Sequence, residues 1–248
     1  MYDLLLVTML LGHVLGDYYF RIGSPANGLG ESLLRFILWH LVYGLTVSLC
    51  VVPLFGFDLL PVIVVLVGWR IANSTALRFI YRRSPNEQRS LTIYFAVTQI
   101  LTLFLIGITV AWMTLRSIPL ATDSGILPVT LALGWDLKAI LVWATAGLLI
   151  LRPSRYTIAF VLERFRVAEW PRGLTHAGAL IGVLERAIVL LLLAVGQFGA
   201  IGLVLTAKSI ARYKSISECI NFSEYYLIGT LLSNLAVIGI FLYTQVMA

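Results

Sequence analysis

The sequence predicts an all-α protein of the polytopic membrane class. Of its 248 residues, 60% are hydrophobic and only 12% are charged, and the mean hydropathy is +0.94. Roughly a quarter of the residues of a soluble domain are charged, so this surface cannot face water on every side. Because backbone polar groups in lipid have to be paired within the chain, apolar runs that span a bilayer form helices. We therefore expect one transmembrane domain over residues 1–248.

Seven apolar runs are separated by stretches rich in Gly, Pro, Asn and charged residues, which are typical of turns and loops. The runs cover about residues 4–20, 33–52, 59–80, 91–115, 126–151, 177–207 and 222–246. The sixth run is longer than one crossing needs. Its glycines at positions 196, 199 and 202 favour a broken or re-entrant helix as an alternative to one crossing. We expect about seven hydrophobic segments, with six and eight as alternatives.

Residues 152–176 form a basic connector between the helices of 1–151 and those of 177–248. From Arg152 to Arg172, arginines alternate with large apolar residues, which predicts an amphipathic interfacial helix near residues 155–170. This surface is a candidate docking face for anionic lipid or a cytoplasmic protein. We expect no nucleic-acid partner, because no basic stripe alternates with exposed aromatic residues.

The positions of the basic loops predict the orientation of the chain. Residues 81–89 and 152–172 are strongly basic, which places both on the cytoplasmic side. Strict alternation of the segments would then place Lys208, Arg212 and Lys214 outside, against the rule. Either residues 177–207 do not cross as one helix, or these cations are buried for a functional purpose.

Ionisable side chains inside the apolar segments form two groups, and the first begins with His13 and Asp17. Their spacing of four residues places them on one face of a helix, and His40 follows in the second segment. Imidazole and carboxylate groups bind divalent metals such as zinc or manganese. Three such ligands with an open position would suit metal-assisted hydrolysis. The alternative is that Asp17 pairs with a cation and the histidines bond to backbone carbonyls.

Arg70 lies about midway through the third segment, where a guanidinium needs an anion, water or a cage of carbonyls. Asn73 shares its helix face at a spacing of three residues. Asp17 and Glu185 are the intramembrane acids that can receive it. We predict a structural ion pair, and the alternative is a contact with an anionic substrate.

The second group is C-terminal, lies in and between the last two segments, and contains both acids and bases. Its members are Glu185, Arg186, Lys208, Ser209, Arg212, Glu224 and Tyr225. Small residues nearby allow close helix packing in lipid. The charged residues predict either an ion-paired cluster that connects three helices or a polar cavity with an anion site around Lys208 and Arg212.

Several motifs together resemble a bacterial integral-membrane family of unknown function, and the resemblance extends over nearly the whole chain. His13-x3-Asp17-Tyr18 matches its opening motif, and His40 matches a histidine of the following helix. The closing motifs are Ala177-Gly178-x-x-Ile181-Gly182-x-Leu184-Glu185-Arg186, Gly196-Gln197-Phe198-x-Ala200-Ile201-Gly202, Ala207-Lys208-Ser209-Ile210-x-Arg212 and Glu224-Tyr225-x-x-Ile228-Gly229-Thr230-Leu231-x-Ser233. The resemblance implies a multi-pass protein of the bacterial inner membrane.

Two further motifs of that family are altered in this chain. The family's third segment has a second His-x3-Asp with a Lys three residues on, and its fourth has Asp-Gln-x-x-His. In the family these groups resemble the surroundings of a metal in a membrane-embedded hydrolase. The residues at the changed positions here are Trp69, Asn73, Ala76, Thr98 and Thr102, and Gln99 is kept. The resemblance therefore implies a dismantled metal site, and we expect no cofactor.

Arg70 stands beside the lost second motif, and we hypothesise that its guanidinium neutralises Asp17 where a metal cation would have done so. The expected function is a non-catalytic membrane protein with a polar intramembrane pocket for binding, transport or signalling. The residues of this pocket are His13, Asp17, His40, Arg70, Asn73 and Gln99. One alternative is a metal-dependent hydrolase with a reduced site of His13, Asp17 and His40. Another is a membrane-anchored helper subunit that docks a cytoplasmic partner.

Overall fold

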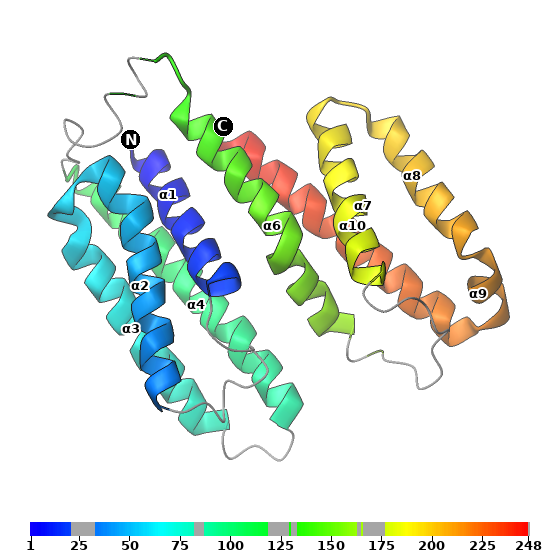
Figure 1. Ribbon diagram of the computed structural model, residues 1–248, viewed down its shortest axis with the longest axis horizontal. Helices are drawn as coiled ribbons and strands as arrows, with labels where there is room; N and C mark the ends of the chain where they lie inside the picture. The colour runs from blue at the N-terminus through cyan, green and yellow to red at the C-terminus, as the bar shows by residue number, and fades with distance from the viewer. Residues whose placement is uncertain are drawn as a thin grey trace. The chain divides into compact units, whose positions relative to one another are not determined.

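The computed structural model describes residues 1–20, 33–81, 87–118, 129, 133–162, 165 and 177–247. Every regular element in these ranges is a helix, which confirms the all-α prediction. The helices in the described ranges that are long and apolar enough to span a bilayer are Leu33–Phe55, Phe57–Ala76, Ile93–Leu115, Leu137–Leu162 and Ile220–Met247. The chain divides into two compact units, Met1–Thr145 and Ala146–Ala248, whose helices are labelled in Figure 1.

The first unit is built around a bundle of four helices with alternating direction (Figure 1). They are α1 (Tyr2–Val14), α2 (Leu33–Phe55), α3 (Leu60–Tyr81) and α4 (Glu87–Leu115). Helix α1 packs against α2 and α4, and α3 packs against the same two helices. At its end α1 widens into a π-helical turn, η1 (Leu15–Tyr19), which contains Asp17.

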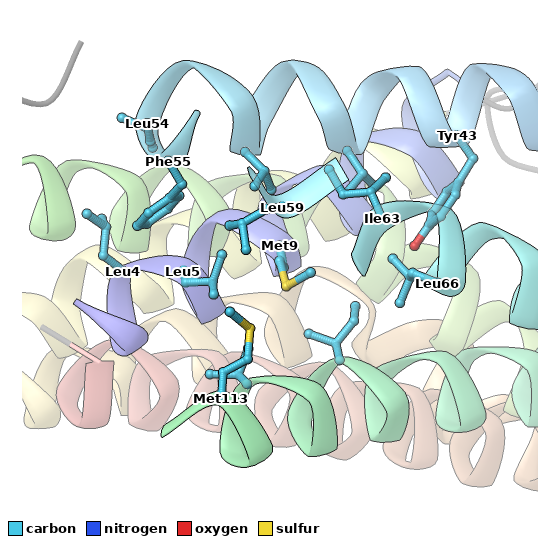
Figure 2. Close-up of a cluster of buried hydrophobic side chains, with 14 residues drawn as sticks. Leu4, Leu5, Met9, Tyr43, Leu54, Phe55, Leu59, Ile63, Leu66 and Met113 are labelled. Carbon is cyan, nitrogen blue, oxygen red and sulfur yellow. The ribbon is translucent and has the colours of Figure 1, made fainter. Parts of the chain in front are cut away.

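Apolar side chains fill one end of this bundle, as Figure 2 shows. Leu5 and Met9 of α1 lie there with Phe55 of α2 and Met113 of α4, all of them buried. The hydroxyl of Tyr2 donates a hydrogen bond of 2.8 Å to the carbonyl of Ile118, just after α4. Burial of this apolar surface holds the four helices together at this end, and the buried polar residues gather toward the other end.

The connection from α2 to α3 is short. Gly56 has a φ of 74°, in the left-handed region that side chains disfavour, so the helix ends there rather than at Pro53 within its last turn. A single turn of 3-10 helix, η3 (Phe57–Leu59), then leads into α3. The tight turn makes α2 and α3 antiparallel neighbours.

The second unit contains the later part of α6 (Leu137–Leu162) and four further helices. These are α7 (Ala177–Ala194), α8 (Phe198–Ala211), α9 (Tyr213–Glu218) and α10 (Ile220–Met247). Val189 and Leu193 of α7 pack with Ala146 and Ile150 of α6 and with Val237 of α10. This second apolar core joins α6, α7 and α10.

The predicted segment at residues 177–207 is two helices. Gly196 has a φ of 73°, and its N–H donates to the carbonyl of Leu193 while that of Gln197 donates to Leu192. These two bonds form a Schellman motif, which ends α7. Helices α7 and α8 pack against each other as a hairpin, visible in Figure 1. Lys208, near the end of α8, therefore returns to the end of the unit where α7 begins, which removes the charge conflict of a single crossing.

Helix α6 continues past residue 151, where the sequence predicted the end of the fifth segment. Pro153 has no N–H to donate to the carbonyl of Leu149, and the hydroxyl of Ser154 donates to that carbonyl at 2.7 Å instead. Residues 155–162 of the predicted interfacial helix are thus the last turns of α6. The rest of that prediction, residues 163–170, lies outside the described residues except for Phe165.

A test of the close packing of α1 on α2 uses Gly12. A Cβ atom at this position would lie 3.0 Å from the backbone Cα of Val47, whereas a Cβ at Gly107 of α4 would meet nothing within 4 Å. We expect Gly12→Ala to lower the free energy of unfolding by about 1–3 kcal/mol through overpacking, and Gly107→Ala to cause no loss. Unfolding by SDS in maltoside micelles measures both. Equal losses in the two variants would contradict the close approach.

Candidate functional site

The first group of predicted polar residues is buried in the first unit. His13, Asp17, His40 and Arg70 are each at most 2% exposed, and Gln99 is 9% exposed. His13 lies in the last turn of α1 and Asp17 in η1, and both contact the side chain of Gln99 on α4. The prediction that His13 and Asp17 share a face is confirmed. Charges buried this deeply need partners within the protein.

Arg70 of α3 is the partner of Asp17. Its Nη2 donates to Oδ1 of the carboxylate, which confirms the predicted ion pair. The guanidinium carbon lies 4.2 Å from the ring centre of Tyr43 and 4.8 Å from that of Trp39, both on α2. Nη1 donates to Oγ1 of Thr102 on α4 at 3.4 Å. The cation is thus compensated by a carboxylate and two aromatic faces.

Gln99 connects this ion pair to His13. Its Nε2 donates to Oδ2 of Asp17, and its Oε1 lies 2.9 Å from Nε2 of His13. Because the amide oxygen only accepts, Nε2 of His13 carries a hydrogen. With a neutral ring, Nδ1 then accepts from the hydroxyl of Tyr43 at 3.1 Å. The hydrogen bonds run in one direction, from Tyr43 through His13 and Gln99 to Asp17.

This arrangement does not fit the predicted metal site. Both oxygens of Asp17 and both ring nitrogens of His13 are engaged by protein groups. His40 donates from Nδ1 to the carbonyl of Phe36, one turn earlier in α2, at 2.8 Å. In the part of the chain that the structure describes, no group of three or more His, Cys, Asp and Glu side chains is placed to hold a metal ion. The metal site of His13, Asp17 and His40 thus stays a prediction that these contacts do not favour.

Asn73 is the member of the predicted set that the network leaves out. It is half-buried, and its amide nitrogen has no hydrogen-bond partner among the described residues. Sequence reasoning missed Trp39 and Tyr43, the aromatic residues that cover the guanidinium of Arg70. The sequence did contain a signal, because Trp39 and Tyr43 are four residues apart, flank His40 and therefore lie on one helix face.

The charged cluster of the second unit surrounds a cavity of about 340 Å³. Helices α6, α7, α8 and α10 form its wall. Four cationic side chains and one carboxylate line it, namely Arg155, Arg186, Lys208, Arg212 and Glu185. Within the described residues, the wall therefore has a large excess of positive charge.

One of these cations is already paired. Nζ of Lys208 lies 2.6 Å from Oε2 of Glu185, and the same ammonium lies 5.4 Å from the ring centre of Tyr226 on α10. The pair connects α8 to α7, and its side chains are about one-fifth exposed. The only carboxylate on the described wall is therefore taken by Lys208.

Three donors on the wall lack partners. Arg186 is 5% exposed, and its Nε donates to the carbonyl of Ile150 on α6 at 3.0 Å. Its Nη2, however, is buried with no hydrogen-bond partner in the described chain, and the hydroxyls of Tyr226 and Thr230 on α10 are in the same situation. Unpartnered buried donors are costly in native proteins. They point to a group that the protein chain itself does not supply.

The predicted cluster is brought together only in part. Arg212 and Tyr225 line the cavity. Ser209 is exposed and donates to the carbonyl of Leu205 in its own helix at 2.9 Å. Glu224 is exposed and lies off the cavity wall, so the predicted balance of acids and bases does not form here. Tyr226 and Thr230 were missed as site residues, although both lie within the closing Glu-Tyr motif.

Comparisons with protein-family models, curated proteins and solved structures found no match. The class of this protein is therefore defined by its own features. It is a helical membrane protein with a buried ion-pair network in one unit and a cationic cavity in the other.

The ion pair makes a direct prediction about stability. Asp17→Asn leaves the buried guanidinium without its counter-charge, and we expect a loss of about 3–5 kcal/mol in the free energy of unfolding. Combining it with Arg70→Met removes both charges and should recover most of that loss. Asp58→Asn, at an exposed carboxylate of η3, serves as the matched control. SDS unfolding measures these three variants and Arg70→Met alone, and strictly additive losses in the double variant would show that the two residues are not coupled.

Proposed function

We propose that this chain is a multi-pass protein of the bacterial inner membrane that binds an anionic ligand in the cavity of its second unit and catalyses no reaction. The observation that carries this proposal is the uncompensated charge of the cavity. Four cations line it, and its one described carboxylate is paired with Lys208. An anion would supply the missing partner.

Arg186 gives the strongest reason for a ligand. A buried guanidinium in apolar surroundings is expensive unless its charge is compensated. Its Nε has a carbonyl partner on Ile150, but Nη2 has none among the described groups. The cavity volume of about 340 Å³ falls within the range of small-molecule sites. An anion in this cavity would accept from Nη2 and neutralise the cation.

The network of the first unit supports a structural role in this proposal. Both oxygens of Asp17 and both ring nitrogens of His13 are taken by neighbouring side chains. A polar network whose charged groups pair with each other fixes helix positions. For the same reason the geometry disfavours the hydrolase with a site of His13, Asp17 and His40.

The location in the bacterial inner membrane rests on the sequence. The motifs of the closing segments resemble a bacterial family, and residues 81–89 follow the charge rule for cytoplasmic loops. The hairpin of α7 and α8 adds Lys208 and Arg212 to the end where α7 begins, in keeping with that rule. The helper-subunit alternative depends on the surface from Arg152 to Arg172, most of which lies outside the described residues.

Anion binding is tested by thermal unfolding of the purified protein in a neutral maltoside detergent. Inorganic phosphate and sulfate, titrated at constant ionic strength, should raise the unfolding temperature, because a ligand that binds only the folded state stabilises it. Arg186→Gln should abolish the rise. Lys214→Gln removes an exposed cation of the same unit that is not on the cavity wall and should leave the rise unchanged. No rise, or equal rises in both variants, would refute the proposal.

The absence of catalysis by a metal is tested separately. We expect purified protein dialysed against zinc and then manganese to retain neither metal in stoichiometric amounts, because His13 and Asp17 have no free ligand atoms for it. Elemental analysis by mass spectrometry gives the metal content. Stoichiometric metal that disappears in His13→Ala would restore the hydrolase alternative.

A further inference from the structure

We infer that the ligand of this cavity is a lipid that presents a phosphate monoester to Arg186, Tyr226 and Thr230. The inference rests on the proposed anion-binding function and specifies its substrate class. Three properties of the wall carry it: the number of unpartnered donors, the amount of excess charge, and the apolar surface beside them.

The number of donors fits a phosphate group. Nη2 of Arg186 and the hydroxyls of Tyr226 and Thr230 are buried without partners in the described chain and line one cavity. Tyr226 and Thr230 are four residues apart on α10, so both lie on the same helix face. A phosphate monoester has three strong acceptor oxygens, whereas a carboxylate has two. A phosphate monoester therefore has as many acceptor oxygens as the wall has unpartnered buried donors.

The excess charge also favours phosphate. The described wall has four cations against the single carboxylate of Glu185. A phosphate monoester has a charge of about −1.5 to −2 at pH 7, so it compensates more of this excess than a carboxylate does. Arginine is also well suited to phosphate, since its guanidinium can donate two parallel hydrogen bonds.

Much of the remaining wall is apolar. Ile158 and Leu162 of α6, Ile181 of α7 and Phe222 of α10 line the same cavity. A free phosphate ion would gain nothing from this surface, whereas an acyl chain would bury it. The outward face of α7 is apolar too, since Leu180 is 61% exposed there. An amphiphile from the surrounding bilayer matches both parts of the wall.

Gly182 keeps the space that the guanidinium occupies. A Cβ atom there would lie 3.3 Å from Nη1 of Arg186, one turn further along α7. Gly182→Ala should therefore displace the guanidinium without removing its charge. Gly239→Ala on α10 is the matched control, because a Cβ at that position meets nothing within 4 Å.

The experiment is native mass spectrometry of the full chain in maltoside micelles with four probes. They are dioleoyl phosphatidic acid, oleate, dioleoylglycerol and inorganic phosphate. We expect one phosphatidic acid per chain, bound about tenfold or more tightly than any other probe, since each hydrogen bond to a charged group contributes to affinity on that scale. Dioleoylglycerol has the same chains without the phosphate, and oleate replaces it by a carboxylate.

Matched variants assign the donors. Arg186→Gln, Thr230→Val, Tyr226→Phe and Gly182→Ala should each weaken phosphatidic acid binding, by about tenfold for the loss of a donor to the charged group. Thr206→Val and Tyr213→Phe change the same side-chain types at exposed positions off this wall and should bind as the wild type does. If Arg186→Gln does not fold, Thr230→Val and Tyr226→Phe still test whether the donors bind the phosphate, since each removes only one hydroxyl.

Each contrary outcome has a distinct meaning. Equal affinity for oleate and phosphatidic acid would overturn the phosphate assignment. Inorganic phosphate that binds as tightly as the lipid would overturn the lipid source but leave anion binding in place. If neither lipid nor inorganic anion binds, and no anion raises the unfolding temperature, the proposed function itself fails.

Discussion

A charge buried away from water has to be compensated inside the protein, and the ion pair between Asp17 and Arg70 is where the first unit meets this requirement. The pair connects η1 to α3. Through Gln99 it includes α4, and through the rings of Trp39 and Tyr43 it includes α2. One carboxylate thus fixes all four helices relative to one another. The apolar contacts around Leu5 and Met113 hold the other end of the bundle, but they are non-directional, so the polar network sets the register.

In the second unit, the buried charge is not fully compensated by the described protein groups. Its carboxylate on the cavity wall, Glu185, is paired with Lys208, and Arg186 keeps a buried nitrogen without a partner in the described chain. In the first unit the carboxylate and the guanidinium neutralise each other, although Nε of Arg70 has no hydrogen-bond partner among the described residues. In the second unit the residues with unpartnered donors line a cavity that also has an excess of cations, and this difference favours a binding site there. The contrast explains why the sequence drew attention to the first unit, whereas the proposed function lies in the second.

The sequence predicted the fold class and the ion pair because both follow from the free-energy cost of placing polar or charged groups in lipid. An Asp and an Arg inside apolar segments are expensive alone, which makes their pairing predictable without a structure. His40 could not be placed in this way, since its bond to the carbonyl of Phe36 is local to one helix. Tyr226 and Thr230 were missed because tyrosine and threonine also occur at ordinary packing positions. Helix α6 continues past Pro153 while the hydroxyl of Ser154 donates the hydrogen bond that the proline cannot. A hydropathy pattern does not indicate such a replacement.

The length of α8 has a consequence for how its hairpin with α7 enters a membrane. Its 14 residues make a helix of about 21 Å at 1.5 Å per residue, whereas the hydrocarbon core of a bilayer is about 30 Å thick. Helix α8 is therefore shorter than a full crossing needs, and it is not among the described helices that are long enough to span. Because the hairpin returns toward the end where α7 begins, its length favours a re-entrant segment over two full crossings.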